Sequence, residues 1–78
     1  MSVRETVRPA AFDFRGLSAY LSRSLASLQR DDAAGRLPRG FRIGRSRRWL
    51  KSEIDNWLAA GAPPRAEWES MRSGRSRT

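Results

Sequence analysis

Arginine is the residue type in this chain with the clearest chemical potential. Fifteen of the sixteen basic residues are arginine, and against eight acidic residues they give a formal net charge of +8. A guanidinium group is planar and permanently charged, so it forms paired hydrogen bonds with phosphate groups and with guanine edges. The composition favours an anionic polymer as partner. A GC-rich coding bias, however, also enriches an ordinary solvated surface in arginine.

Catalytic and metal-binding chemistry is poorly supported. The chain has no cysteine and no histidine, so thiolate and imidazole ligands and the commonest general base are absent. The spacing of the carboxylates matches neither a catalytic pair nor an oxygen-ligand metal loop. We therefore expect no enzyme activity, no cofactor, no metal and no small-molecule substrate. The acidic residues interpreted as solvated helix faces are Asp31, Asp32, Glu53, Asp55, Glu67 and Glu69.

Two groups of side chains have the types that contact nucleic acids. Gln29 and Arg30 lie in an expected helix over 25–34 and can bond adenine and guanine bidentately. A basic hairpin over 41–51 carries a row of arginines that suits a phosphate backbone or a narrow minor groove. Each position also fits an ordinary solvated site, and charge on a hairpin edge prevents aggregation. The outer helix positions are Ser24, Ala26, Ser27, Gln29 and Arg30, and the hairpin arginines are Arg42, Arg45, Arg47 and Arg48.

Capping residues and apolar periodicity predict two helices before the hairpin. Asp13 is a suitable N-cap for a helix over 14–21, and Ser24 for the helix over 25–34. The short turn between them has the spacing of a helix-turn-helix, whose second helix presents its N-terminal side chains to bases. The apolar residues expected to face inward are Phe14, Leu17, Leu21, Leu25 and Leu28.

The hairpin is predicted from alternating apolar and basic residues. Gly35 ends the preceding helix in a left-handed conformation, and residues 44–47 supply the hairpin turn. An isolated hairpin is barely stable in water. We therefore expect Phe41, Ile43 and Trp49 to lie against the helices and the arginines to point outward.

Two more helices are expected after the hairpin. Ser52 caps the third, with Asp55 forming a variant of the capping box, and Gly61 ends it. Pro64 begins a fourth helix over 64–72. The apolar side chains of these helices are assigned to the core, although the last two could instead offer a patch to another protomer. They are Ile54, Trp57, Leu58, Trp68 and Met71.

These elements make one small domain, of mainly α class with a β-hairpin wing, that is, a winged helix-turn-helix of three to four short helices. Residues 1–11 are expected to form a flexible basic arm, which could enter a minor groove or stay solvated. Residues 12–72 form the domain with a C-terminal helical extension, and 73–78 a disordered basic tail. No apolar run is long enough for a membrane span and no leader is visible, so a cytoplasmic location is expected.

Residues 24–57 resemble the small winged helix-turn-helix domains of the AlpA/excisionase group, which are relatives of the MerR DNA-binding domain. The resemblance covers about residues 12–61, and residues 60–71 are similar to a C-terminal extension of some members. Asp31 and Asp32 depart from the group, which commonly has an apolar residue there. The matching residues, in order, are Gly35-Arg36-Leu37-Pro38, Arg42-Ile43-Gly44-Arg45, Trp49, Ile54 and Trp57-Leu58.

The resemblance implies that the second helix enters the major groove of double-stranded DNA and that the hairpin is the wing. It implies a transcriptional regulator or an excisionase-like recombination factor, associated with the nucleoid and, in the second case, with a recombinase. Because one small module reads few bases, a homodimer or a head-to-tail oligomer on DNA is expected. By position, the implied DNA contacts are Arg23, Ser24, Ala26, Ser27 and Arg30 in the groove and Arg45, Ser46, Arg47 and Arg48 in the wing.

Two other functions fit the same composition. An RNA-binding basic protein would need the charge but not a groove-sized helix, and the expected burial of the aromatic residues leaves no platform for base stacking. A small protein-interaction adaptor would use Trp68 and Met71 as its contact surface.

Overall fold

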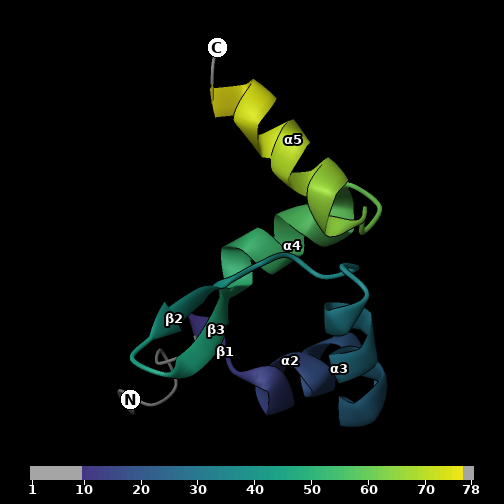
Figure 1. Ribbon diagram of the computed structural model, residues 1–78, viewed down its shortest axis with the longest axis vertical. Helices are drawn as coiled ribbons and strands as arrows, with labels where there is room; N and C mark the ends of the chain where they lie inside the picture. Colours follow the sequence, from purple (N-terminus) through teal and green to yellow (C-terminus); the bar gives the residue numbers. More distant parts are fainter. Residues whose placement is uncertain (1–9, 77–78) are drawn as a thin grey trace, which may run out of the picture.

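A computed structural model of the chain describes residues 10–76 and confirms the predicted fold class. The described part is mainly helical, with a small antiparallel sheet, as in winged helix-like domains. Figure 1 shows the sheet on one side, α2 and α3 on the other, α4 between them and α5 projecting beyond α4. The elements are β1 (Ala11–Phe12), α2 (Phe14–Leu21), α3 (Leu25–Ala33), β2 (Phe41–Ile43), β3 (Ser46–Leu50), α4 (Lys51–Ala59) and α5 (Arg65–Ser76).

Local hydrogen bonds begin α2 and α3 as predicted. The Asp13 carboxylate accepts the backbone N–H of Gly16 at 2.8 Å, and the Ser24 hydroxyl accepts that of Ser27 at 3.1 Å. Between the helices, Ser22 takes a left-handed conformation with φ of 56°, which reverses the chain within a few residues. The two short helices are therefore joined by the predicted tight turn.

The sheet contains a strand that the sequence pattern did not predict. β1 pairs antiparallel with β3, placing Ala11 opposite Leu50 and Phe12 opposite Trp49, and β2 lies on the other side of β3. Assigning Ala11 to a flexible arm was therefore wrong, because two residues are too few for alternation to be visible. Residues 1–9 of the predicted arm lie outside the described residues.

Tryptophan side chains are central to the core and their polar atoms are satisfied. Trp49 is fully buried and donates its indole N–H to the Pro38 carbonyl at 2.8 Å. Trp57 does the same to Pro63 at 2.8 Å. Buried indoles normally find such a partner, because an unpaired buried donor is costly. The core residues are Phe12, Leu17, Leu28, Leu37, Trp49, Ile54, Trp57 and Trp68.

The start of α4 differs from the prediction. The helix begins at Lys51, and Leu50 occupies the cap position without a side-chain hydrogen bond, so Ser52 is not the cap. Asp55 does not complete a capping box: it accepts a hydrogen bond from Lys51 Nζ at 2.8 Å and another from the Tyr20 hydroxyl of α2. The Asp55 carboxylate therefore bonds Tyr20 and Lys51 instead of a backbone N–H group at the start of α4.

α5 packs through Trp68, which is buried and donates to Glu53 Oε2 of α4 at 3.0 Å. Its assignment to the core is confirmed. Met71 and Leu58 were also assigned to the core, but they are 37% and 43% exposed. The prediction that these two side chains lie in the core was therefore wrong.

The C-terminal boundary also differs from the prediction. α5 begins at Arg65, directly after Pro64, and continues to Ser76. Residues 73–76, expected to be a disordered tail, are helical and continue α5 without a break. Residues 77–78 lie outside the described part.

Candidate nucleic-acid interface

The outer side of α3 presents an exposed polar face. Ala26, Gln29 and Arg30 are exposed and lie at the i, i+3 and i+4 spacing that shares one helix face. Arg30 donates from its guanidinium to the Ser27 hydroxyl at 3.2 Å, which holds it along the helix. The Ser24 hydroxyl oxygen accepts the helix-cap bond, and its O–H donor is left for its predicted role towards DNA. The face available to a partner is therefore centred on Gln29 and Arg30.

Asp31 ties the segments on either side of α3 together. Its carboxylate lies 2.8 Å from Arg23 Nε, in the turn before α3, and 3.3 Å from a guanidinium nitrogen of Arg36, after it. Asp31 is only 9% exposed, so its interpretation as a solvated position was wrong. Arg23 remains half exposed while paired, which keeps it at the edge of the α3 surface.

Asp32 joins α3 to the sheet and to α5. Its carboxylate lies 2.6 Å from a terminal guanidinium nitrogen of Arg47 on β3 and 2.8 Å from one of Arg65, the first residue of α5. The Arg65 Nε also donates to the Leu37 carbonyl at 2.8 Å. The solvated interpretation of Asp32 was therefore also wrong. Its partly buried ion pairs stand where the resemblance would place an apolar residue.

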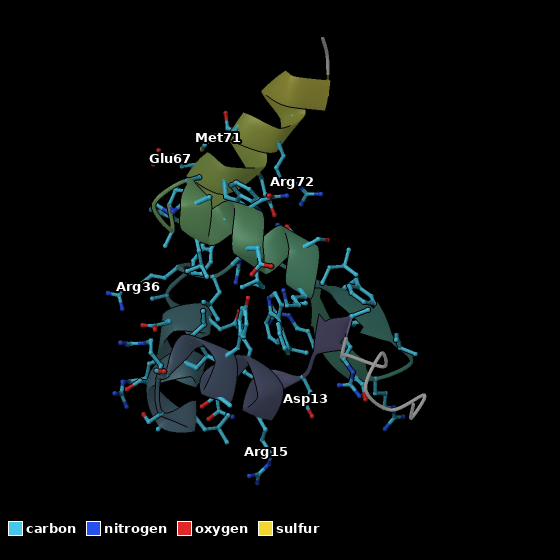
Figure 2. The ribbon with its side chains drawn as sticks, turned by 180° about the vertical axis from the view of Figure 1, so that it is seen from behind. Asp13, Arg15, Arg36, Glu67, Met71 and Arg72 are labelled. Carbon is cyan, nitrogen blue, oxygen red and sulfur yellow. The ribbon has the colours of Figure 1, made fainter. Side chains whose placement is uncertain are left out.

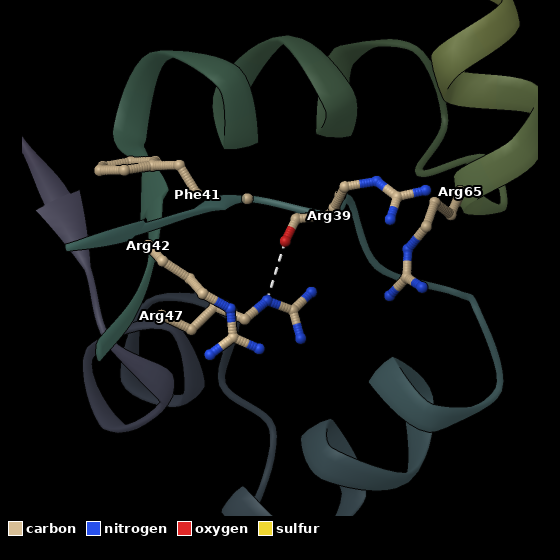
Figure 3. A pocket seen from close by; sticks show the side chains of 6 residues that line it. Arg39, Phe41, Arg42, Arg47 and Arg65 are labelled. Carbon is tan, nitrogen blue, oxygen red and sulfur yellow. Dashed lines mark hydrogen bonds between the residues drawn. The ribbon is translucent and has the colours of Figure 1, made fainter. Parts of the chain in front are cut away.

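Arg47 does not point outward as predicted for a wing residue. Its Nε donates to the Arg39 carbonyl at 2.8 Å, drawn as a dashed line in Figure 3. Its guanidinium carbon lies 4.6 Å from the centre of the Trp49 ring, and the side chain is 20% exposed. Arg47 therefore stabilises the packing of β3, through contacts typical of a cation over an aromatic face.

The predicted inner face of the hairpin was also wrong. Strand pairing places Phe41 opposite Arg48 and Ile43 opposite Ser46, on the face that does not carry Trp49. Phe41 and Ile43 are consequently 37% and 63% exposed. The predicted alternation was correct, but alternation does not show which face of the hairpin the helices cover. The covered face carries Arg47 beside Trp49, where an apolar residue was expected.

Two hairpin arginines remain fully available. Arg42 on β2 and Arg45 in the turn are exposed, whereas Arg48 is half-buried and donates to the Arg47 carbonyl at 3.2 Å. Gly44 supplies the positive φ of 61° that a two-residue hairpin turn requires. Because the turn contains so few residues, Ser46 and Arg47 belong to β3, whereas both were predicted to lie in the turn.

The two candidate clusters lie at the same end of the molecule. In Figure 1 the hairpin and the α2–α3 pair occupy the end opposite to α5. Figure 2 shows Arg15 of α2 pointing away from the domain at this end, whereas Arg72 lies on α5.

Exposed ion pairs shift the titration of two acidic groups. The hydrogen bond from Arg39, at 3.0 Å, lowers the pKa of the Glu69 carboxyl and raises the pKa of Arg39. The hydrogen bond from Lys51, with that from Tyr20, lowers the pKa of Asp55. Glu69, Asp55 and Arg39 are therefore charged at neutral pH.

Sequence reasoning missed two arginines of this region. Arg39, in the linker before β2, and Arg65, at the start of α5, line a cleft together with Arg42 and Arg47 (Figure 3). They lie outside the hairpin in sequence, so neither alternation nor helical periodicity connects them to it. The only signal for Arg39 was that it follows Arg36 closely in the basic segment before the hairpin, and no local signal pointed to Arg65.

Within residues 10–76, histidine, cysteine, aspartate and glutamate side chains nowhere gather into a group of three that could hold a metal. None of the helices in the described part is long and apolar enough to cross a membrane. The fold is compatible with a small winged helix-like domain, mainly helical with a small antiparallel sheet. Neither a known protein family, nor a curated protein, nor a solved structure matches the chain.

Proposed function

We propose that this protein binds double-stranded DNA, with α3 in the major groove and the hairpin beside the backbone as a wing. The observation that carries the proposal is the exposed face of α3 around Gln29 and Arg30, on a helix that lies at the same end of the domain as the hairpin (Figure 1). A helix following a tight turn from another helix is the element that fits a major groove. The net charge of +8 supports an anionic partner.

The exposed side chains suggest which residues would contact bases and which would contact phosphates. Arg30 suits guanine and Gln29 suits adenine, whereas small Ala26 permits close approach to a thymine methyl group. Arg42 and Arg45 on the hairpin suit phosphates, which position the domain without reading sequence. Neither Asp31 nor Asp32 would strongly repel the backbone, because each is paired with two arginines.

The biological role proposed for this binding is that of an AlpA-type transcriptional regulator or of an excisionase-like factor acting with a recombinase. Both roles use the same contacts, and bending of the DNA would add shape readout to either. A module of this size covers few base pairs, so we propose that copies pair or stack along adjacent sites on DNA in the nucleoid.

Selection from a random duplex library tests the proposal. The selected duplex, a scrambled duplex and a single strand are then titrated at several salt concentrations. We expect an enriched motif bound far more tightly than the scrambled duplex. The spacing of repeated half-sites would reveal pairing on DNA. Equal affinity for all three ligands with a steep salt dependence would contradict sequence reading and leave charge as the only attraction.

A second candidate, binding of single-stranded nucleic acid or RNA, is favoured by one observation. Phe41 is exposed on the hairpin, opposite Arg48 on the same face of the sheet, whereas the sequence pattern had placed it in the core. An exposed aromatic ring next to a cation is the usual platform for an unpaired base. Tighter binding to the single strand than to any duplex, lost in Phe41→Ala, would favour this function.

A further inference from the structure

A cleft beside the hairpin gathers arginines from separate parts of the chain. Arg39 comes from the linker, Arg42 from β2, Arg47 from β3 and Arg65 from the start of α5. In Figure 3 the guanidinium groups of Arg42, Arg47 and Arg65 point into the same space. The cleft has a volume of about 450 Å³ and is also lined by Gly40 and Phe41. A small anionic group, rather than an apolar ligand, fits such a lining.

The charges around the cleft are not balanced. Its four guanidinium groups face two carboxylates, since Asp32 pairs with both Arg47 and Arg65, and Glu69 pairs with Arg39. Among the described residues, no carboxylate pairs with Arg42. The cleft therefore keeps an excess of positive charge.

Arg42 is also held against another cation. The strand register places it directly opposite Arg47. Like charges in directly opposed positions destabilise a sheet, so an anion between them would relieve repulsion. A side chain at Gly40, in the wall of the cleft, would place its Cβ 2.4 Å from the Arg48 carbonyl, so this position packs closely against β3.

We propose that this cleft binds one phosphate group. The main expected source of this phosphate is the backbone of bound DNA, and to that extent the inference rests on the proposed function. A free phosphate compound has the same chemistry and is the other source. Arg42 would form the leading contact because it has no competing carboxylate among the residues described. Arg47 and Arg65 would add positive charge while keeping their bonds to Asp32. Guanidinium groups bind phosphate oxygens through short, charge-assisted hydrogen bonds.

Glu69 acts in this proposal as a competitor for Arg39. The Arg39–Glu69 pair is largely exposed, with side-chain exposures of 71% and 39%, so a phosphate can exchange for the carboxylate at little cost. Removing the Glu69 charge should therefore strengthen phosphate binding. Glu67 lies two residues earlier on the exposed side of α5 and supplies a matched control (Figure 2).

The first measurement titrates inorganic phosphate into the full chain while NMR follows the arginine side-chain N–H signals. We expect saturable shifts at Arg39 and Arg42, absent with chloride at equal ionic strength. Arg42→Ala should abolish saturation, and Glu69→Gln should tighten binding by up to about fivefold relative to Glu67→Gln, as release of an exposed ion pair allows. Non-saturating shifts spread over all arginines would overturn the site for free phosphate.

The second measurement uses the selected DNA duplex. Arg42→Ala should weaken binding roughly tenfold and flatten the salt dependence by about one unit of slope, as loss of one phosphate contact predicts. Glu69→Gln should strengthen binding more than Glu67→Gln. If the wild-type chain binds the duplex specifically but Arg42→Ala and Glu69→Gln leave affinity and slope unchanged, the DNA-phosphate assignment is overturned and the proposed function stands.

If the chain binds no duplex, the proposed function fails. Saturable phosphate shifts at Arg39 and Arg42 would then assign the cleft to a free phosphate compound, and their absence would overturn the cleft as a phosphate site. Thermal denaturation of each variant accompanies both measurements. The substituted side chains, Arg42 and Glu69, lie outside the core, so their replacement leaves the fold intact.

Discussion

The carboxylate of Asp32 and the guanidinium group of Arg47 lie 2.6 Å apart, joining the end of α3 to the middle strand of the sheet. Arg47 lies over Trp49 at the same time, so one cation fills the space between the helix and the core. The position of the hairpin relative to α3 therefore depends on a partly buried ion pair. A groove-reading helix and a wing can contact one duplex together only if this relative position is maintained.

Replacement of Arg47 should destabilise the fold. In Arg47→Met the apolar stem remains, but Asp32 loses one of its two arginines and the Arg39 carbonyl loses its donor. We expect a loss of roughly 2–3 kcal/mol, above the about 0–1 kcal/mol typical of exposed pairs and below the about 3–5 kcal/mol of fully buried ones. Urea denaturation measures the loss. Arg45→Met, in the exposed turn, is the control, and equal stability of the two variants would contradict a structural role for Arg47.

Gly40 should tolerate no side chain. Gly40→Ala forces a left-handed φ of 75° on alanine and brings its Cβ to 2.4 Å from the Arg48 carbonyl and 3.1 Å from the Trp49 ring. Gly35→Ala is the matched control, because Gly35 has the same φ of 75° but no atom within 4 Å of such a Cβ. The control should cost about 1–2 kcal/mol, and Gly40→Ala about 1–3 kcal/mol more. Similar costs for both changes would show that the linker moves freely away from β3.

Asp55 should make stability depend on acidity. Hydrogen bonds from Lys51 and then from Tyr20 lower the pKa of the Asp55 carboxyl in the folded chain. A lowered folded-state pKa contributes stability above the ordinary carboxyl pKa of about 3.9, and this contribution is lost as the pH falls through the folded-state value. The Tm of Asp55→Asn should thus lie below wild type at pH 7, and the difference should shrink on acidification below about pH 4. A constant difference from pH 7 to pH 3 would contradict this linkage.

Arg30 and Arg45 should affect DNA binding differently. Arg30→Ala should weaken binding to the selected duplex by about 1–3 kcal/mol and relax the base preference at one position. Arg45→Ala should weaken binding to every duplex alike and reduce the salt slope by about one. Competition titrations against single-base variants of the selected site distinguish the two patterns. Arg72→Gln, on α5, controls for the loss of one positive charge, and its thermal stability is measured alongside because Arg72 also pairs with Glu53 at 2.7 Å.

The helical part of the fold was predictable because its determinants are local. Asp13 and Ser24 each bond a backbone N–H three residues later, and such caps can be recognised from residue type alone. Gly35 and Gly61 have positive φ angles after the second and third helices, as expected of helix-terminating glycines. The exposed face around Gln29 and Arg30 followed from the same periodicity. Whether these side chains read bases remains a prediction.

The sheet and the cleft were not predictable by the same reasoning. Alternation along β2 and β3 shows that Phe41 and Arg42 face opposite ways, but it does not show which of them meets the helices. That choice was made by long-range partners, since Asp32 and Trp49 accommodate Arg47 on the inner face. β1 is also defined by its pairing with β3 rather than by its own residues.

By itself, the sequence determined the charge of the chain, the order of its helices and the residues that end them, because these depend on composition and on contacts between near neighbours. Tertiary structure alone decided which arginines are structural and which are exposed. Ion pairing depends on distance in space, so Asp32 engages Arg65 across 33 positions of the chain and leaves Arg42 without such a partner in the described part. The residues close to each arginine in the sequence do not show this difference.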